Sequence, residues 1–264
     1  MSLFFAAITP HPPFLVPNAP AEQKKKLKKT ATAFTALEHE LYVSFPDTIV
    51  ILTGHGTGMA GAFVLNAGPK MRPDFSEIGD LKKYPDFRGD TRLASHIKES
   101  ADRAHLPLQI QHSVKLDHGS SLPLFYLTAH LPKIKVITIG YSLLTPKDHF
   151  DFGYLLKDVI LHTTSRVALI ASGDLSHCLT SDAPGGFSAA GKKFDEKILE
   201  MIQGGNTSGL LTLDAKMVKA SQECALNSLL IFFGALQRMK YTPRILAYEH
   251  PFGVGYLTAE MELH

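Results

Sequence analysis

Four histidines in short turns are the residues of this sequence best suited to chemistry. The chain contains 13 histidines, and histidine is both the commonest metal ligand and the usual acid or base near neutral pH. An open α/β sheet binds its ligands beyond the carboxyl ends of its strands, where such turns lie. Glycine, proline or aspartate stands within three residues of each of the four, which are His11, His55, His118 and His177. We expect them to converge on one cleft.

A carboxylate would complete such a cleft, and two glutamates compete for this role. Glu223 stands at the start of a segment that is apolar nearly all round as far as Leu236, so its helix should be buried. The positive end of a helix keeps a carboxylate ionised, as a metal ligand must be. Glu249 precedes His250 at the end of a predicted strand, but adjacent strand residues point to opposite faces and would not share an ion. We therefore favour Glu223.

Each of these residues also fits a purely structural role when it is taken alone. A histidine in a turn can cap a helix, and Asp117 and Asp174 can be ordinary turn residues. Glu223 can simply complement the positive end of its helix. Only the joint arrangement of histidines and an acid favours a site, so the elements that bring them together decide the interpretation.

The elements expected around these turns form an α/β sandwich, because continuous apolar, β-branched runs suit strands covered on both faces. The sequence predicts a single α/β domain over residues 1–264, with a central, largely buried sheet flanked by helices. Strands are expected at Leu3–Ile8, Thr48–Thr53, Ile134–Ile139, Val167–Ser172, Arg244–Glu249 and Gly255–Glu262. Helices are expected at Ala21–Val43, Thr91–Ala104, Leu122–His130, Pro146–Thr164, Phe187–Ile202 and Gln222–Leu236. The segment Asn66–Gly89, rich in Gly, Pro, Asp and Lys, is expected to be an inserted surface excursion.

Composition narrows the class of partner. With 45% hydrophobic residues in 264, the chain can bury a substantial core. Its 27 basic and 25 acidic residues leave a formal charge of +2, which argues against nucleic acid or a membrane surface as partner. Two cysteines argue against a disulfide framework and favour a cytoplasmic location. We expect a small-molecule substrate and, as the default for such an enzyme, a homo-oligomer.

Four ordered motifs resemble those of the class III extradiol ring-cleavage dioxygenases, the superfamily of the protocatechuate 4,5-dioxygenase catalytic subunit and of the DOPA dioxygenase branch. The resemblance runs from His11 to the closing segment 252–256. The motifs are Thr9-Pro10-His11-Pro12-Pro13, Asp117-His118-Gly119-Ser120-Ser121-Leu122-Pro123-Leu124, Gly173-Asp174-Leu175-Ser176-His177 and Glu223-Cys224-Ala225-Leu226-Asn227-Ser228.

This resemblance implies an enzyme that uses Fe(II) and O2 to open the ring of a catechol-like aromatic diol. His11, His55 and Glu223 would be the metal ligands, and His118 and His177 the catalytic acid/base pair. Two imidazoles and one carboxylate bind one face of Fe(II) and leave positions for the diol and O2. The metal lowers the pKa of a diol hydroxyl, and a nearby histidine can take its proton.

Two other interpretations remain open for the same residues. The superfamily also resembles Memo-like proteins without demonstrated ring-cleaving activity, in which the carboxylate position is a cysteine. Since Cys224 follows Glu223, an alignment slip of one residue would exchange the two, and we favour Glu223 because a hard carboxylate suits Fe(II) and O2 chemistry. A zinc hydrolase is the second alternative, because two histidines and an acid with open positions also describe catalytic zinc.

Overall fold

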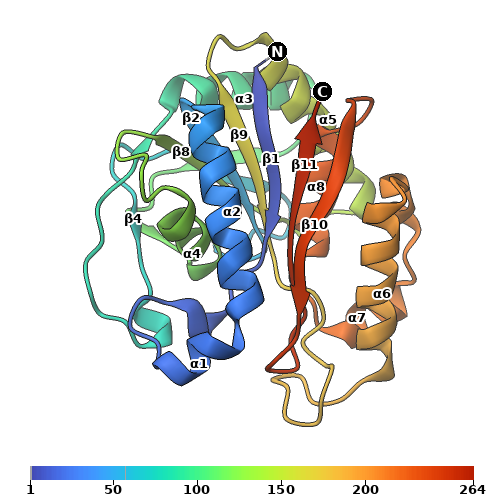
Figure 1. Cartoon of the computed structure of the whole chain (residues 1–264). Coiled ribbons are helices and arrows are strands. Elements are labelled where there is room, and N and C mark those ends of the chain that lie inside the picture. The colour runs from blue at the N-terminus through green and yellow to red at the C-terminus, as the bar shows by residue number, and fades with distance from the viewer. Residues whose placement is uncertain (1, 57) are drawn as a thin grey trace.

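Parallel pairing of buried strands forms the centre of the fold (Figure 1). The computed structural model describes residues 2–56 and 58–264. In it β1 (Leu3–Thr9), β9 (Val167–Ser172), β2 (Thr48–Thr53) and β8 (Lys135–Gly140) lie side by side and run parallel. Every residue of β2 and β9 is buried, as continuous apolar runs predict. These four strands confirm the expected ones to within a residue.

Shorter and antiparallel strands extend the sheet to nine in the described residues, in the order β10-β11-β1-β9-β2-β8-β3-β6 with β5 also paired to β8. The C-terminal strands β10 (Tyr241–Glu249) and β11 (Tyr256–Leu263) were expected. The sequence analysis missed β3 (Phe63–Asn66) and β6 (Leu108–Gln111), which have four residues each. The two-residue strands are β5 (Arg88–Gly89) and a separate pair, β4 (Arg72–Pro73) with β7 (Lys115–Leu116).

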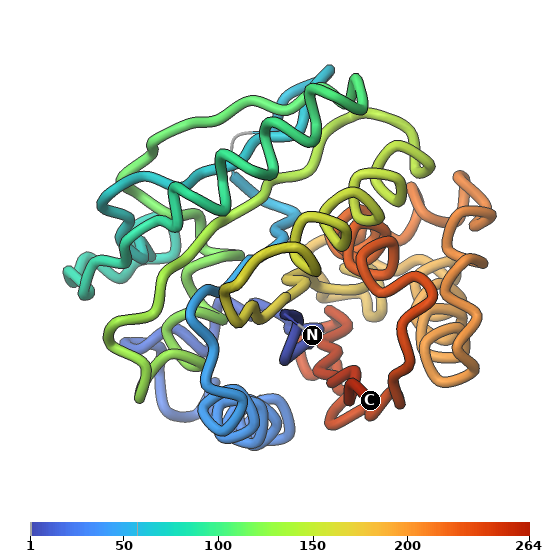
Figure 2. Tube along the Cα trace, turned by 90° about the horizontal axis from the view of Figure 1, so that it is seen from above, coloured from blue at the N-terminus to red at the C-terminus, as the bar shows by residue number. Residues whose placement is uncertain are grey.

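Helices cover both faces of the sheet, which gives the predicted sandwich (Figure 2). One hydrophobic core lies under α2 (Lys28–Ser44) and α4 (His118–Leu127). The other packs against α3 (Thr91–Arg103), α5 (Pro146–His162), α6 (Ala189–Gln203) and α8 (Leu226–Ala235). The remaining elements are α1 (Ala21–Lys26), α7 (Ala215–Ser221), η1 (Pro13–Leu15), η2 (Ser76–Ile78) and η3 (Thr207–Thr212). Among the described residues, no helix combines the length and apolarity needed to cross a bilayer.

The helix expected at Leu122–His130 begins and ends earlier, as α4, and three further expectations are wrong for local reasons. The single helix expected over Ala21–Val43 is broken at Leu27, whose ψ of 30° ends α1 before α2 begins. The helix expected from Gln222 starts only at Leu226, because Gln222 takes a left-handed φ of 51° that ends α7. The segment Asn66–Gly89 is more than a surface excursion, since Phe75 within it is fully buried in the core under α4.

Two glycines let α5 and α8 cross closely. A side-chain carbon on Gly153 would lie 2.0 Å from the carbonyl oxygen of Ile231, and one on Gly234 would lie 2.2 Å from that of Phe150. Both obstacles are backbone atoms, so neither can move without shifting a helix. The crossing therefore fixes α8 and the loop that leads into it.

We predict that Gly153→Ala lowers the free energy of unfolding by about 1 to 3 kcal/mol, because overpacking forces the two helices apart. Urea denaturation followed by circular dichroism measures this. Gly61→Ala is the matched control: no atom lies within 4 Å of its added carbon, so its effect should stay within about 0.5 kcal/mol. Equal stability of both variants would contradict the close crossing.

Candidate metal centre

Loops at the carboxyl ends of the parallel strands bring three of the predicted histidines together. His11 follows β1, His55 follows β2 and His118 is the first residue of α4. One ring nitrogen from each lies within 4.8 Å of the other two. The rings of His55 and His118 have their centres 4.3 Å apart. The predicted convergence of these three on one cleft is thus observed.

The hydroxyl of Ser172 determines which ring nitrogen of His11 faces the other histidines. The Ser172 hydroxyl donates to the carbonyl of Gly119 (2.5 Å) and lies 3.0 Å from Nδ1 of His11. A carbonyl can only accept, and the hydroxyl has one proton, so Nδ1 of His11 must donate to Ser172 Oγ. The other nitrogen, Nε2, therefore presents its lone pair to the histidine group, as a metal ligand requires.

Pro123 explains why the Gly119 carbonyl is free to accept this bond. Proline lacks the N–H that would otherwise bond to the carbonyl four residues earlier in the helix. Pro123 stands inside α4, and the carbonyl that it leaves without a helical partner is that of Gly119. The Ser172 hydroxyl takes that position, so the helix irregularity and the orientation of His11 are linked.

Asp117 joins the loops of His55 and His118. Its carboxylate accepts hydrogen bonds from the hydroxyl of Thr53 (2.8 Å) and from the backbone N–H of Ser120 (3.0 Å), which caps α4. The backbone N–H of His55 in turn donates to Thr53 Oγ (3.0 Å). Asp117 therefore connects the end of β2 to the start of α4.

Burial keeps the histidines neutral. Burial, and then the charge of neighbouring His118, lower the pKa of His55 to about 4. Burial also lowers the pKa of His11 well below its usual value, and the pKa values of His118 and His177 fall for the same reason. Repulsion from His177 contributes to the low pKa of His11 and of His55, so His177 lies near the group. Neutral imidazoles are the form that binds metal or accepts a proton.

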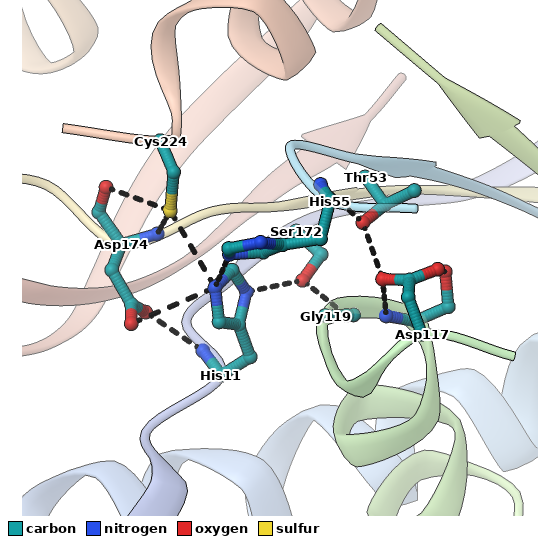
Figure 3. Close-up of polar contacts among 9 residues, drawn as sticks. His11, Thr53, His55, Asp117, Gly119, Ser172, Asp174 and Cys224 are labelled. Atoms are coloured by element: carbon teal, nitrogen blue, oxygen red, sulfur yellow. Dashed lines mark hydrogen bonds and ion pairs between the residues drawn. The ribbon is translucent and has the colours of Figure 1, made fainter. Parts of the chain in front are cut away.

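Cys224 and Asp174 stand beside His11 (Figure 3). The sulfur of Cys224 lies 3.5 Å from His11 Nε2 and accepts a hydrogen bond from the backbone N–H of Asp174. One Asp174 oxygen accepts from the backbone N–H of His11 (2.8 Å), and the other lies 3.7 Å from His11 Nε2. Burial raises the pKa of Asp174 to about 7 and that of the Cys224 thiol well above its usual value.

Neither predicted carboxylate joins the histidines in the structure. The Glu223 side chain accepts a hydrogen bond from the backbone N–H of Leu226 (2.6 Å) at the start of α8, which is the structural role weighed against a ligand role. Glu249 accepts bonds from the N–H and hydroxyl of Thr30, at 2.7 Å each. Cys224, the residue after Glu223, instead lies beside His11.

Two distances at His11 Nε2 match those expected between ligands of one metal ion. Two imidazole nitrogens bound to one ion at about 2.1 Å lie about 3.0 to 3.4 Å apart, and a thiolate sulfur lies about 3.1 to 3.6 Å from such a nitrogen. His11 Nε2 is 3.0 Å from His55 Nε2 and 3.5 Å from Cys224 Sγ. The Asp174 oxygen at 3.7 Å is slightly too far for an oxygen ligand. Among the described residues, the group whose ligand atoms all lie within 4.8 Å of one another consists of His11, His55 and His118. Cys224 and Asp174 flank this group at His11 Nε2, and of the two the sulfur lies at the distance that a shared ion requires.

A cavity of about 430 Å³ opens onto this group. Two of the histidines form part of its wall, and the loop after β2, the excursion segment, β7 and the start of α4 supply the rest. Its lining residues are His55, Gly56, Asp74, Ser76, Glu77, Lys115, Leu116, Asp117 and His118. A small ligand there would reach the nitrogen atoms directly.

We predict that Ser172→Ala weakens metal binding about 10- to 100-fold, since removal of an outer hydrogen-bond partner of a ligating histidine usually costs this much. Isothermal titration with Zn(II) measures the affinity, and circular dichroism checks the fold. Ser208→Ala, a loss of the same hydroxyl at an exposed site, should leave the affinity unchanged. An unaltered affinity in Ser172→Ala would show that the hydroxyl does not orient His11.

Comparison with known proteins shows the family and the fold of the chain. The family model of the catalytic LigB subunit of aromatic ring-opening dioxygenase matches residues 5–259. Protein CA_C1420 of Clostridium acetobutylicum is 31% identical over 271 aligned positions, which cover 99% of this chain but only 58% of that relative. The crystal structure of the uncharacterized protein JW3007 from Escherichia coli K12 has the same fold, with a TM-score of 0.72, 18% identity and coverage of 97% and 99% of the two chains. The chain therefore belongs to the family of the catalytic LigB subunit of aromatic ring-opening dioxygenases.

Proposed function

We propose that this chain is a transition-metal protein of the Memo-like type, with His11, His55 and Cys224 as its metal ligands. The observation that carries this proposal is the sulfur of Cys224, 3.5 Å from the free nitrogen of His11, while the Glu223 carboxylate is bonded to its own helix. Family membership supports a metal-dependent protein, and the cysteine supports the branch without ring cleavage.

The ligand type bears on the chemistry that the site can perform. Thiolates favour softer ions such as zinc or Cu(I), whereas carboxylates suit Fe(II) and oxygen chemistry. A thiolate close to activated oxygen is itself open to oxidation to sulfenic and sulfinic acid. Cys224 lies in direct contact with His11, so it would share any ion that binds O2 there. This argues against ring opening at a Cys224 site.

Extradiol ring opening with Fe(II) is the second candidate, and Asp174 favours it. Its carboxylate lies 3.7 Å from His11 Nε2, so a shift of a few tenths of an ångström would complete a two-histidine, one-carboxylate set. A bound Fe(II) would then supply Lewis-acid activation of the diol and contact with O2. His118 lies on the cavity wall and is neutral because burial lowers its pKa. Its ring nitrogen could accept the proton of a diol hydroxyl. His177 would be the second acid or base.

Metal stoichiometry of three variants separates these ligand sets. We predict that Cys224→Ala loses the metal, whereas Glu223→Gln, which changes the adjacent residue, retains it. Asp174→Asn should also retain it, because our set does not use that carboxylate. Elemental analysis after anaerobic purification gives the metal content. Loss of metal in Asp174→Asn, with Cys224→Ala still loaded, would favour the dioxygenase set instead, and loss only in Glu223→Gln would restore the ligand predicted from sequence.

Oxygen uptake tests the reaction itself. We expect the protein reconstituted anaerobically with Fe(II) to consume no more O2 than the metal-free control across a panel of catechols and gallates. If a yellow ring-opened product forms instead, the dioxygenase candidate is correct. His118→Ala and His177→Ala should then keep the iron and lose about 10²- to 10⁴-fold in turnover, as removal of a general acid or base usually does.

A further inference from the structure

Asp195 on α6 is a buried carboxylate outside the histidine group, and it is 1% exposed. Its Oδ1 accepts the backbone N–H of Ser176 (2.8 Å), and its Oδ2 accepts the hydroxyl of Tyr248 on β10 (2.7 Å), the strand against which α6 lies (Figure 1). Burial raises the pKa of Asp195 to about 6, and these two bonds act in the opposite direction. Burial of an ionised acid is costly, so the value of Asp195 to the protein lies in the groups that it bonds.

Two glycines make room for this contact. A side-chain carbon on Gly255 would lie 2.1 Å from Oδ2 of Asp195, and one on Gly191 would lie 2.3 Å from the hydroxyl oxygen of Ser176. Side-chain carbons do not approach other atoms so closely. The helix α6 and the residue before β11 can therefore come this near to Ser176 only because both positions are glycine.

Ser176 is bonded on every side to a different part of the chain. Its N–H donates to Asp195, its carbonyl accepts from the N–H of Gly255 (2.9 Å), and its hydroxyl donates to the carbonyl of Ser221 (3.1 Å). The hydroxyl oxygen also accepts from the N–H of Cys178 (3.0 Å). Every polar group of this fully buried residue is thus paired, so Ser176 cannot shift without breaking several bonds.

The residues on either side of this serine are bonded to the segment that carries Cys224. The N–H of Asp174 donates to Cys224 Sγ (3.2 Å), and the N–H of Cys224 donates to the carbonyl of Asp174 (3.1 Å). On the other side, the N–H of His177 donates to the carbonyl of Ser221 (2.9 Å). The Asp174 side chain also accepts the N–H of His11 (2.8 Å). A displacement of the serine would therefore reach both Cys224 and His11 through hydrogen bonds.

We propose that Asp195 is a positioning residue of the metal centre: by holding the N–H of Ser176 it fixes segment 174–177 and, through that segment, sets Cys224 at its distance from His11. This inference rests on the proposed metal site and adds a residue that acts on it through the backbone. Because the action requires only an acceptor for one N–H, an amide oxygen at position 195 should replace the carboxylate, whereas a methyl group should not.

Three variants separate the loss of this bond from the loss of a buried acid. Asp195→Ala removes the acceptor of the Ser176 N–H, and Asp195→Asn keeps an oxygen for it. Asp90→Ala is the matched control. Asp90 is also buried and accepts two hydrogen bonds, from the N–H of Leu93 and the hydroxyl of Thr48, but Thr48 begins β2 and so lies at the end of that strand away from the histidines. Both alanine variants should lose stability in urea.

Metal affinity is measured by isothermal titration of the full chain with Co(II), and the thiolate charge-transfer absorption of the bound ion reports the contact with Cys224. We expect Asp195→Ala to weaken binding about 2- to 30-fold, the range for a network residue that contacts neither partner, and to reduce this absorption at saturating metal. Asp195→Asn should stay within about 2-fold of the original chain. Asp90→Ala should leave both the affinity and the spectrum unchanged.

Tyr248→Phe is the milder test if Asp195→Ala does not fold. It keeps the acceptor of the Ser176 N–H but frees the other carboxylate oxygen, so that Asp195 is held less firmly. The affinity for Co(II) should fall about 2- to 5-fold, at the lower end of the same range. An unchanged affinity in Tyr248→Phe, when Asp195→Ala cannot be measured, would overturn the proposal.

The failure of this inference can be told apart from the failure of the metal site. Alkylation of Cys224 by iodoacetamide in metal-free protein, followed by mass spectrometry of its peptide, reports the position of the thiol without an ion. If the original chain binds no metal, yet Asp195→Ala and not Asp90→Ala changes this alkylation rate, the metal site is overturned and the positioning role stands. If the rate is also unchanged, both are overturned. Intact metal binding in Asp195→Ala, or an equal loss in Asp90→Ala or Asp195→Asn, overturns the positioning role alone.

Discussion

The site depends on the register of three parallel strands. Thr9 of β1 pairs with Ser172 of β9, and Ser172 pairs in turn with Thr53 of β2, so the three strands end in one row. The residues that follow this row are His11, Asp174 and His55. A shift of one residue in either pairing would turn every side chain of a strand to the other face, and the loops would no longer place these groups together. The register is strongly specified because β2 and β9 are buried along their whole length.

The same row of residues also orients the ligands. Ser172 and Thr53 are both the last residues of their strands, and both use their hydroxyls, toward His11 and Asp117 respectively. In a buried site each such bond matters, because an unpaired polar group costs about 1 to 3 kcal/mol. Close backbone contact adds a second constraint: a side-chain carbon on Gly54 would lie 2.0 Å from the carbonyl oxygen of Cys224. The end of β2 and the loop before α8 can therefore meet only where residue 54 is glycine.

The sequence predicted the parts of this arrangement that depend on local pattern. The buried strands could be predicted because short apolar, β-branched runs are typical of strands covered on both faces. The histidines that follow them could be predicted as site residues because α/β sheets bind ligands beyond the carboxyl ends of their strands. Which of Glu223 and Cys224 lies beside His11 could not be predicted in this way. The position of these residues depends on the left-handed turn at Gln222, after which α8 begins four residues later than expected. A glutamine side chain does not indicate such a turn. Similarly, the polar composition of Asn66–Gly89 hid the fact that Phe75 anchors it beside the cavity.

The acidic members of the site are suited to a cation because of their burial. Without a positive charge nearby, ionised groups in a buried site are costly, and burial accordingly raises the pKa values of Asp174 and of Cys224. The three histidines respond in the opposite direction and become neutral. The group can thus stay near electroneutrality in two ways: with its acids protonated, or with them ionised around a divalent ion. The second state releases protons on binding, which is the usual behaviour of sites whose ligands must be deprotonated. A site made of histidines alone would leave the charge of the ion uncompensated.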